Sequence, residues 1–261
     1  MSVVITHYNR PEFLPQAIRS VADQAYPAAL IELVVIDDGS PDPNVTHALD
    51  RIERDFQFPA RGWKLLREPN RYLGGARNAA LTHARGEYVL FMDDDNYAKP
   101  HEVQDFVRVM ENTRADVLTS ALDFVWGKDP PDPDYLRLKH TRSFDAPPGG
   151  KLSPSFAFLG GSAEAGLFKN SFGDANSFVR VSSFEELGGY TLDKHVGYED
   201  WEFYSKAVIR GYRLQSLPTS QYHYRFTSGS MQKSTRYSKN RTRALREYLK
   251  LLGVKPPTFP G

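Results

Sequence analysis

Apolar and polar positions follow two different spacings along the first half of the chain. Short apolar runs are typical of buried strands, and apolar residues three or four positions apart are typical of helices that bury one face. The runs predict strands at Ser2–Thr6, Leu30–Ile36, Trp63–Arg67, Glu87–Met92 and Asp116–Val125. The helical spacing predicts helices at Pro11–Ala25, Val45–Phe56, Gly74–Ala84 and Pro100–Asn112. This alternation predicts an α/β fold, with a mostly parallel sheet covered by helices on both faces.

The alternation stops at Gly127. Residues 127–175 are rich in proline and glycine and show no clear periodicity, which predicts a functional flap, an inserted binding segment or partial disorder. A strand at Asn176–Val181 and a short helix at Ser182–Leu187, ending at two glycines, are expected next. The remaining predicted elements are a helix at Glu199–Arg210, an extended segment at Tyr212–Leu217 and a last helix at Thr235–Leu252.

Composition excludes several classes of protein. The 261 residues, 40% hydrophobic and 25% charged, are sufficient for one substantial core. The chain contains no cysteine, so disulfides and thiol chemistry are excluded. No apolar run approaches the roughly 20 residues of a membrane helix. The predicted location is therefore the cytoplasm, with peripheral membrane contact left open.

Charge is distributed unevenly. The net charge of +1 gives no general attraction to nucleic acid. From Arg225 onward, however, nine basic residues accompany a single acid, Glu247. The basic residues are Arg225, Lys233, Arg236, Lys239, Arg241, Arg243, Arg246, Lys250 and Lys255. Three explanations remain open: a solvated face of the last helix, a contact with a phosphate group, or docking to an anionic surface.

Three consecutive carboxylates, Asp93, Asp94 and Asp95, follow the fourth predicted strand. If the strand continued through them, Asp93 and Asp95 would share one face and Asp94 would point to the other. Two carboxylates about 5 Å apart repel by roughly 3 kcal/mol at an effective dielectric constant near 20. A bound cation would offset this repulsion, and oxygen ligands suit Mg²⁺ or Mn²⁺. The alternative is a solvated acidic turn.

Two further polar clusters follow predicted strands. Thr6-His7-Tyr8-Asn9-Arg10 follows the first strand, and Asp37-Asp38-Gly39-Ser40 follows the second. Ligands of open parallel sheets bind at the carboxyl ends of the strands, so these clusters and the three aspartates are expected to converge on one edge. A tyrosine can stack on a base there, a carboxylate can accept from a ring N–H, and a basic residue can meet a diphosphate. Each cluster alone is also compatible with an ordinary turn.

These clusters belong to an ordered set of motifs. The set comprises Val3-Val4-Ile5-x-x-Tyr8-Asn9-Arg10, Val35-Ile36-Asp37-Asp38-Gly39-Ser40, Gly74-Gly75-Ala76-Arg77-Asn78, Gly86-Glu87-Tyr88, Met92-Asp93-Asp94-Asp95, Phe184-x-x-Leu187-Gly188-Gly189-Tyr190 and Tyr198-Glu199-Asp200-Trp201-Glu202-Phe203. It resembles the family 2 glycosyltransferases of the GT-A fold. The resemblance implies metal-dependent, inverting transfer of a sugar from a nucleotide diphosphate donor, usually UDP, to a hydroxyl group of a glycan or glycoconjugate. It also implies one catalytic domain over 1–261, with a nucleotide-binding half (1–125), an acceptor-binding half (126–225) and a basic C-terminal lid or helix (226–261).

The resemblance assigns roles to residues by position. The implied donor-binding residues are Thr6, Tyr8, Arg10, Asp37, Asp38, Arg77, Asn78, Asp93 and Asp94. Among them, Asp38 would accept from the uracil N3–H, and Arg77 and Asn78 would border the base and ribose. Asp95, together with Asp93, would hold Mn²⁺ or Mg²⁺. The chain has Thr6-His7 where family members commonly show Pro-Thr, which leaves the details of the first loop open.

Glu199 and Asp200 form the second chemical group. By resemblance, Asp200 matches the general base and Glu199 its neighbour. A base is needed because a sugar hydroxyl is a poor nucleophile until its proton is removed. The alternative is that both acids only complement the start of a helix.

Three histidine and loop assignments remain open. His223, expected in a loop after Tyr212–Leu217, is a candidate third metal ligand or a histidine stacked among tyrosines. His195 lies shortly before Asp200 and could touch the acceptor. A loop at about 226–240 is expected to fold over the donor diphosphate through Arg225, Lys233 or Arg236.

Two other functions compete with glycosyl transfer. A sugar-1-phosphate nucleotidyltransferase would need a glycine-rich phosphate loop after the first strand, where this chain has Thr-His-Tyr-Asn-Arg-Pro. A non-catalytic nucleotide-sugar or glycan-binding domain would not need both acidic sets. The sugar contacts are expected within residues 155–180, with Gly173-Asp174-Ala175-Asn176 as the first candidate.

Overall fold

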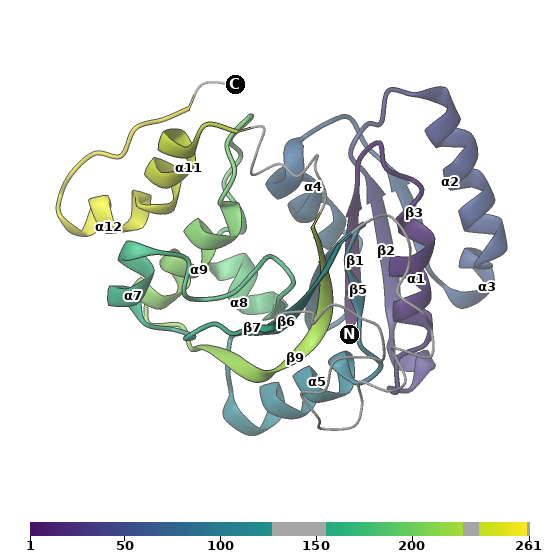
Figure 1. The fold of residues 1–261 in the computed structure, drawn as a ribbon, viewed down its shortest axis with the longest axis horizontal. Helices are drawn as coiled ribbons and strands as arrows, with labels where there is room; N and C mark the ends of the chain where they lie inside the picture. Colours follow the sequence, from purple (N-terminus) through teal and green to yellow (C-terminus); the bar gives the residue numbers. More distant parts are fainter. Residues whose placement is uncertain (127–154, 227–234, 260–261) are drawn as a thin grey trace.

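The computed structural model describes residues 1–126, 155–226 and 235–259. Within them, nine strands form one sheet in the order β3-β2-β1-β4-β8-β6-β9-β5, with β7 paired to β6 (Figure 1). The strands are β1 (Ser2–His7), β2 (Glu32–Asp37), β3 (Lys64–Arg67), β4 (Tyr88–Asp93), β5 (Tyr97–Ala98), β6 (Val117–Trp126), β7 (Ser155–Phe156), β8 (Phe178–Arg180) and β9 (Leu214–Phe226). The first four strands along the chain are parallel, and β8 joins them antiparallel to β4. The α/β prediction is confirmed.

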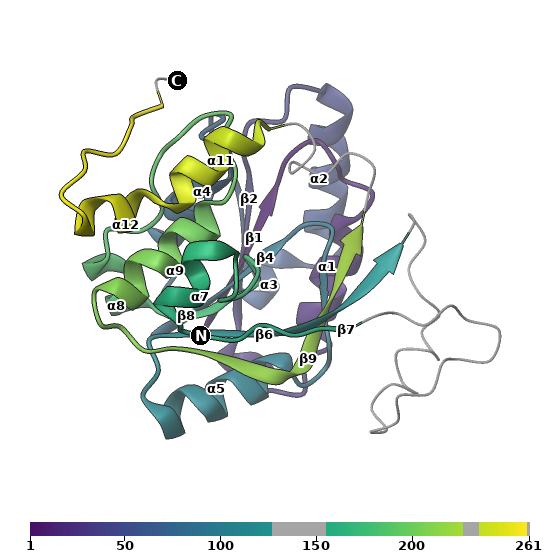
Figure 2. The ribbon, with the colours of Figure 1, turned by 60° about the vertical axis from the view of Figure 1, so that its left-hand side comes forward.

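Helices cover both faces of the sheet. They are α1 (Leu14–Ala22), α2 (Pro43–Asp55), α3 (Phe58–Arg61), α4 (Tyr72–Leu81), α5 (Glu102–Thr113), α7 (Ala163–Phe168), α8 (Val181–Glu186), α9 (Glu199–Ile209), α11 (Tyr237–Ala244) and α12 (Arg246–Leu251), with a short 3₁₀ turn, η1 (Ala28–Leu30). Figure 2 shows α7, α9 and α11 stacked on the side of the sheet away from α1.

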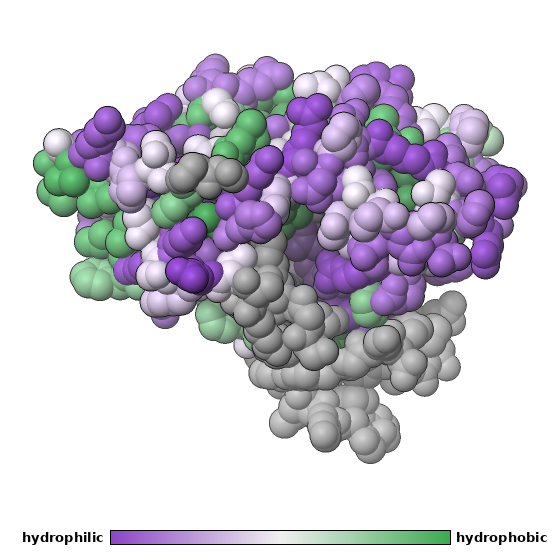
Figure 3. Space-filling view, turned by 90° about the horizontal axis from the view of Figure 1, so that it is seen from above, coloured by the Kyte–Doolittle hydropathy of each residue, from purple (hydrophilic) through white to green (hydrophobic). Residues whose placement is uncertain are grey.

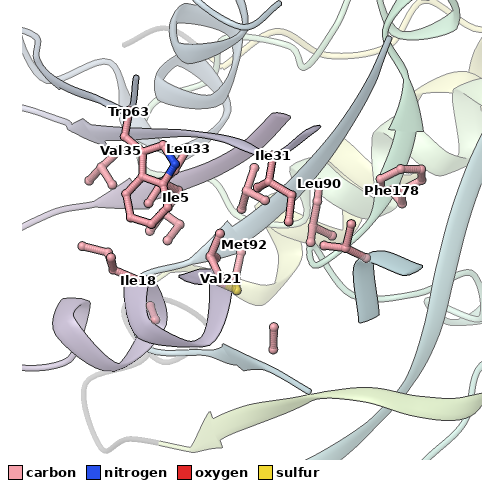
Figure 4. Packing of buried hydrophobic residues seen from close by; sticks show 14 of the residues in the cluster. Ile5, Ile18, Val21, Ile31, Leu33, Val35, Trp63, Leu90, Met92 and Phe178 are labelled. Atoms are coloured by element: carbon pink, nitrogen blue, oxygen red, sulfur yellow. The ribbon is translucent and has the colours of Figure 1, made fainter. Parts of the chain in front are cut away.

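Strand alternation assigns the apolar residues to two cores. In β1, Val3 and Ile5 pack with the apolar stripes of α1, α2 and α5, and Figure 4 shows this core around Ile5, Val21 and Trp63. Val4, between them, packs on the other face with residues of α4, α8 and α9. Because every residue of β1 and nearly every residue of β2 and β4 is buried on one face or the other, these strands appear as apolar runs.

Three elements of the second half differ from the prediction. The strand expected at Asn176–Val181 is only β8, and the segment expected to end at Leu217 continues to Phe226 as β9. Pro218 lacks an N–H to donate, and the pairing of β6 with β9 slips there, from Ser120↔Leu217 to Ala121↔Ser220. The bulge lets the strand continue past the proline. The last predicted helix is divided into α11 and α12 at Leu245.

Two of the predictions lie largely outside the described residues. The first is the segment 127–175, of which only the later part, with β7 and α7, is described. The second is the predicted lid, whose Lys233 lies outside the described residues. Among the described helices, none is both long and apolar enough to cross a membrane.

Candidate active site

Parallel pairing brings the polar strand ends together. Thr6 at the end of β1 lies opposite Asp93 of β4, and His7 lies opposite Asp37 of β2. Figure 3 looks onto this edge, where hydrophilic side chains surround a hollow near the middle of the face. The three clusters that the sequence placed at strand ends are therefore neighbours in space.

Two arginines bind the run of three aspartates. Arg10 donates to Asp94 Oδ1 through Nη2 and to Asp95 Oδ2 through Nη1, the latter at 2.6 Å. Asp93 Oδ1 accepts from Arg77 Nη2 at 2.7 Å. The predicted alternation of side chains does not extend through the run, because β4 ends at Asp93 and the chain turns there. Asp94 and Asp95 consequently share one guanidinium.

Three carboxylates face two guanidiniums in this run, so negative charge remains in excess. Burial, opposed in part by Arg10 and reinforced by Asp94 and Asp93, raises the pKa of Asp95 to about 7. Asp94 is fully buried, and its Oδ2 lies 2.8 Å from His7 Nδ1. His7 therefore supports the aspartate run from β1. Its role could not be anticipated from the sequence, because nothing in the local spacing links it to a residue 87 positions away.

The second strand end holds two acids in different surroundings. Asp37 accepts from the backbone N–H of Ser40 at 3.2 Å, and also from its hydroxyl. Asp38 accepts from the backbone N–H of Arg71 at 2.6 Å, and burial, with Asp37 beside it, raises the pKa of Asp38. Tyr8, the predicted base-stacking residue, is 45% exposed. The ring is therefore accessible at the end of β1.

Arg77 and Asn78 follow each other on α4 but have different partners. Arg77 is completely buried and joins two acids, donating to Asp93 at 2.7 Å and to Glu199 Oε1 at 2.9 Å. These acids hold the pKa of Arg77 above its ordinary value although burial opposes the charge. Asn78 donates to the carbonyl of Tyr190 at 2.8 Å and accepts from its N–H at 3.0 Å. In this structure Asn78 thus holds the Tyr190 loop, and its contact with base or ribose stays a prediction.

Asp200 lies in the first turn of α9, beside Glu199. Its Oδ2 accepts from Asn170 Nδ2 at 3.4 Å, and the same amide donates to the Gly173 carbonyl at 2.7 Å. Burial, together with the charges of Glu199 and Asp174, raises the pKa of Asp200 to about 8. A carboxyl with a pKa in this range can take up a proton near neutral pH.

His223 differs from its prediction. It lies within β9 rather than in a loop, and its ring stacks on Tyr97 with centroids 4.6 Å apart. Because side chains alternate along a strand, its neighbours Tyr222 and Tyr224 point to the opposite face. The Tyr222 hydroxyl donates to Asp174 Oδ2 at 3.0 Å. His223 therefore stacks on a tyrosine of β5 and not on its neighbours in the sequence, and its metal-binding role stays a prediction.

Two residues of the site were missed or only touched on by sequence reasoning. Burial raises the pKa of Asp174 to about 6, with Asp93 contributing, so Asp174 lies within electrostatic range of the aspartate run. Burial and the charges of Asp174, Asp93, Asp95 and Asp200 raise the pKa of Tyr224. Tyr224 is therefore within electrostatic range of both the aspartate run and Asp200. A sequence signal existed only for Asp174, in the stretch expected to meet the sugar.

The basic C-terminal segment is not simply a solvated face. Arg243 is 2% exposed and Arg246 is 8% exposed, and both bind Glu202. Arg225 is also buried, and its Nε donates to the Asp95 carbonyl at 3.1 Å. Lys239 and Arg236 are exposed. The explanation by a wholly solvated face is therefore wrong for these three buried arginines.

The donor set fits a divalent cation in part. Within the described residues, no group of three or more His, Cys, Asp or Glu side chains is placed to hold a metal ion by itself. Asp93 and Asp95 offer carboxylate oxygens in a turn with excess negative charge. Mg²⁺ sites typically combine one or two carboxylates with substrate phosphates and waters. Two aspartates with a bound diphosphate would meet that requirement.

Comparison with known proteins places the chain in a family. A family model described as Glycosyl transferase family 2 matches residues 2–188. The chain belongs to this family. An uncharacterized glycosyltransferase of Nostoc sp. is 36% identical over 129 residues, which are 49% of this chain and 38% of the relative. Another from Bacillus subtilis, YwdF, is 23% identical and covers 98% of this chain and 83% of its own length.

Solved structures show that this family 2 chain has the GT-A fold. Staphylococcus aureus TarS 1-349 in complex with UDP-GlcNAc matches with a TM-score of 0.68 and 21% identity, over 94% of this chain and 64% of that one. A mannosyltransferase from Pyrobaculum calidifontis in complex with GDP-Man and Mn²⁺ matches with a TM-score of 0.64 and 18% identity, over 99% of this chain and 65% of that one. The family 2 chain therefore spans less than two thirds of these structures and under two fifths of the Nostoc relative.

Proposed function

We propose that this family 2 chain is a metal-dependent inverting glycosyltransferase that moves a sugar from a nucleotide diphosphate donor to a hydroxyl group of a glycan or glycoconjugate. One observation carries the proposal. Buried Arg77 binds both Asp93 at the sheet edge and Glu199 at the start of α9. A donor bound at the aspartates and an acceptor bound at Asp200 would therefore be separated by about the width of one guanidinium group.

The donor nucleotide fits the strand ends of β1 and β2. The exposed ring of Tyr8 is available for stacking, and Asp38 can accept from the N3–H of uracil. Arg10 offers a guanidinium, which suits phosphate oxygens. UDP is the first candidate because TarS carries UDP-GlcNAc in its structure, and GDP is the second because of the mannosyltransferase.

Asp95 and Asp93 would hold Mn²⁺ or Mg²⁺ at the diphosphate. When bound, such an ion stabilises the negative charge that develops on the departing nucleotide. The raised pKa of Asp95 supports this assignment, because added positive charge would favour its ionised form.

Asp200 acts as the general base in this proposal. Its carboxylate takes the proton of the acceptor hydroxyl as that oxygen bonds to the anomeric carbon. The bond from this carbon to the phosphate oxygen breaks, and the electron pair leaves with the nucleoside diphosphate. Attack from the side opposite the leaving group inverts the anomeric configuration. Asn170 donates to Asp200 Oδ2 and so orients the base.

The test is a panel of sugar nucleotides incubated with the chain, once with Mn²⁺ and once with EDTA. UDP-GlcNAc, UDP-glucose and GDP-mannose are the probes, and free nucleotide and the anomer of the product are measured. We expect metal-dependent release from one nucleotide class. Pyrophosphate release from UTP and a sugar 1-phosphate would instead indicate a nucleotidyltransferase. Nucleotide binding without any release would indicate a binding domain.

A further inference from the structure

The loop that leads into α9 is held in an unfavourable conformation. It comprises residues 191–198, and two of its residues, His195 (φ 57) and Tyr198 (φ 66), have left-handed backbone angles. Non-glycine residues pay about 1–3 kcal/mol for such angles and keep them only where the surroundings enforce them. Tyr198 immediately precedes Glu199 and Asp200. Whatever enforces this loop also determines where α9 begins.

Asn240 of α11 is one of the groups that enforce it. Its Oδ1 accepts from the Gly197 N–H at 2.9 Å, and its Nδ2 donates to the Thr235 hydroxyl at 2.7 Å. The side chain is 2% exposed. A Cβ at Gly197 would lie 3.3 Å from Asn240 Nδ2, so the backbone and the amide are in close contact.

Arg243, one turn later, holds the loop at two further points. Its Nη1 donates to the Val196 carbonyl at 2.7 Å, and its Nη2 donates to the Thr191 carbonyl at 2.7 Å. Nε donates to Glu202 Oε2 at 2.8 Å, in the first turn of α9. One buried guanidinium thus connects both ends of the loop with α9. Figures 1 and 2 show α11 lying beside α9.

The same loop also contacts the start of α4, in the N-terminal half of the chain. The Tyr72 hydroxyl lies 2.5 Å from His195 Nε2, and the two rings meet edge to face with centroids 4.7 Å apart. Tyr72 also has a left-handed backbone (φ 61) and follows Arg71, whose N–H binds Asp38. The loop therefore lies between α11 and the segment that contacts Asp38.

We propose that Asn240 and Arg243 are positioning residues for the reaction, acting through loop 191–198 to align Asp200 with the donor. The inference rests on the proposed function and deepens it. It gives the basic C-terminal segment a role that needs neither a phosphate nor a membrane. Both residues lie beyond residues 2–188, the part of the chain that the family model matches.

The test centres on Asn240, because its replacement removes no charge. Asn240→Ala loses the Gly197 contact, Asn240→Asp retains an acceptor oxygen for it, and exposed Lys239→Gln is the control on the same helix. Nucleotide release is measured with water as acceptor, UDP-GlcNAc being the first probe, and is divided by the number of UDP sites from calorimetry. We expect release per site to fall about tenfold in Asn240→Ala, since misplacement of about 1 Å can cost up to a hundredfold. UDP affinity should change by less than about twofold.

The pattern across variants separates positioning from folding. Asn240→Asp is expected to restore most of the release, and amide exchange at Gly197 and Tyr198 should speed up only in Asn240→Ala. Unchanged release per site in Asn240→Ala would overturn the proposal, as would equal losses of release and UDP affinity. A wild type that releases no nucleotide from any donor would count against the proposed function itself, and the role of Asn240 would fall with it.

Discussion

The site contains two acidic groups whose neighbours differ in charge. At the sheet edge, Asp93, Asp94 and Asp95 each accept from an arginine. At the start of α9, Asp200 accepts from the neutral amide of Asn170, and Glu199 and Asp174 add negative charge around it. The same side chain is thereby suited to two tasks. In the proposed function, the first group holds a cation with the diphosphate, and the second takes up a proton.

Removing the proton acceptor should have the largest effect. Asp200→Asn preserves the shape of the side chain but cannot accept a proton, so turnover is expected to fall about 10³-fold, within the range for general bases. UDP affinity should stay the same, because the proposed donor contacts follow β1, β2 and β4 and do not include Asp200. The measurement combines steady-state nucleotide release with calorimetric titration of UDP. Turnover at the wild-type rate would remove Asp200 as the base.

The reciprocal change weakens the cation-binding group. Asp95→Asn is expected to weaken UDP binding in Mn²⁺ by about tenfold or more, because a contact with a charged group contributes about 1.5–3 kcal/mol. Binding in EDTA should be nearly the same for variant and wild type. Asp50→Asn is the matched control, because Asp50 pairs with Arg67 at an exposed site. If metal-dependent binding survived in Asp95→Asn, the cation would be held elsewhere.

Sequence patterns predicted the parallel half of the fold well, and the physical reason is local. Unbroken apolar runs, and the polar clusters that follow three of the four strands, are properties of neighbouring residues. The sequence prediction ended this strand at Leu217, and only the pairing of β9 with β6 shows that a bulge accommodates Pro218.

Long-range contacts explain what remained hidden in the site. Arg77 was expected at the donor, yet its second partner, Glu199, lies 122 positions away. The burial of Arg243 and Arg246 depends on Glu202 and Asp193, and a basic run in the sequence cannot distinguish this from a solvated face. The sequence shows which residues are charged, whereas the fold decides which of them form ion pairs.

The charge around Asp200 gives a pH prediction of intermediate size. The base is active when ionised, so turnover should rise with pH and level off above the pKa of Asp200, about 8. Glu199→Gln removes a negative neighbour, which lowers the pKa of Asp200 and moves the rising limb to lower pH, by about one unit for each 1.4 kcal/mol of repulsion removed. The measurement is the pH profile of nucleotide release for both proteins. A shift to higher pH would contradict the assignment.

The smallest effect on activity is expected for substitution of Glu102. This residue tests whether a raised pKa by itself marks a carboxyl group that takes part in the reaction. Burial raises the pKa of Glu102 to about 8, similar to Asp200, but the residue is fully enclosed. Asn176 Nδ2 donates to its Oε1 at 2.6 Å, and among the described residues Oε2 and Asn176 Oδ1 have no hydrogen-bond partner. A proton on Oε2 would supply the missing donor, so the folded protein favours the neutral acid.

The sign of the stability change follows from this pKa. The unfolded chain ionises Glu102 near pH 4.5, the ordinary value. The stability that neutral Glu102 contributes is therefore fully present below that pH, and this contribution is lost as the pH rises toward the folded pKa of about 8. Glu102→Gln keeps a neutral partner for Asn176, so it should reduce this loss and raise the melting temperature at pH 9 by about 2–4 °C per kcal/mol. Turnover should stay within about twofold. A large loss of turnover with stability retained would mean that Glu102 serves the reaction, and that burial alone does not distinguish it from Asp200.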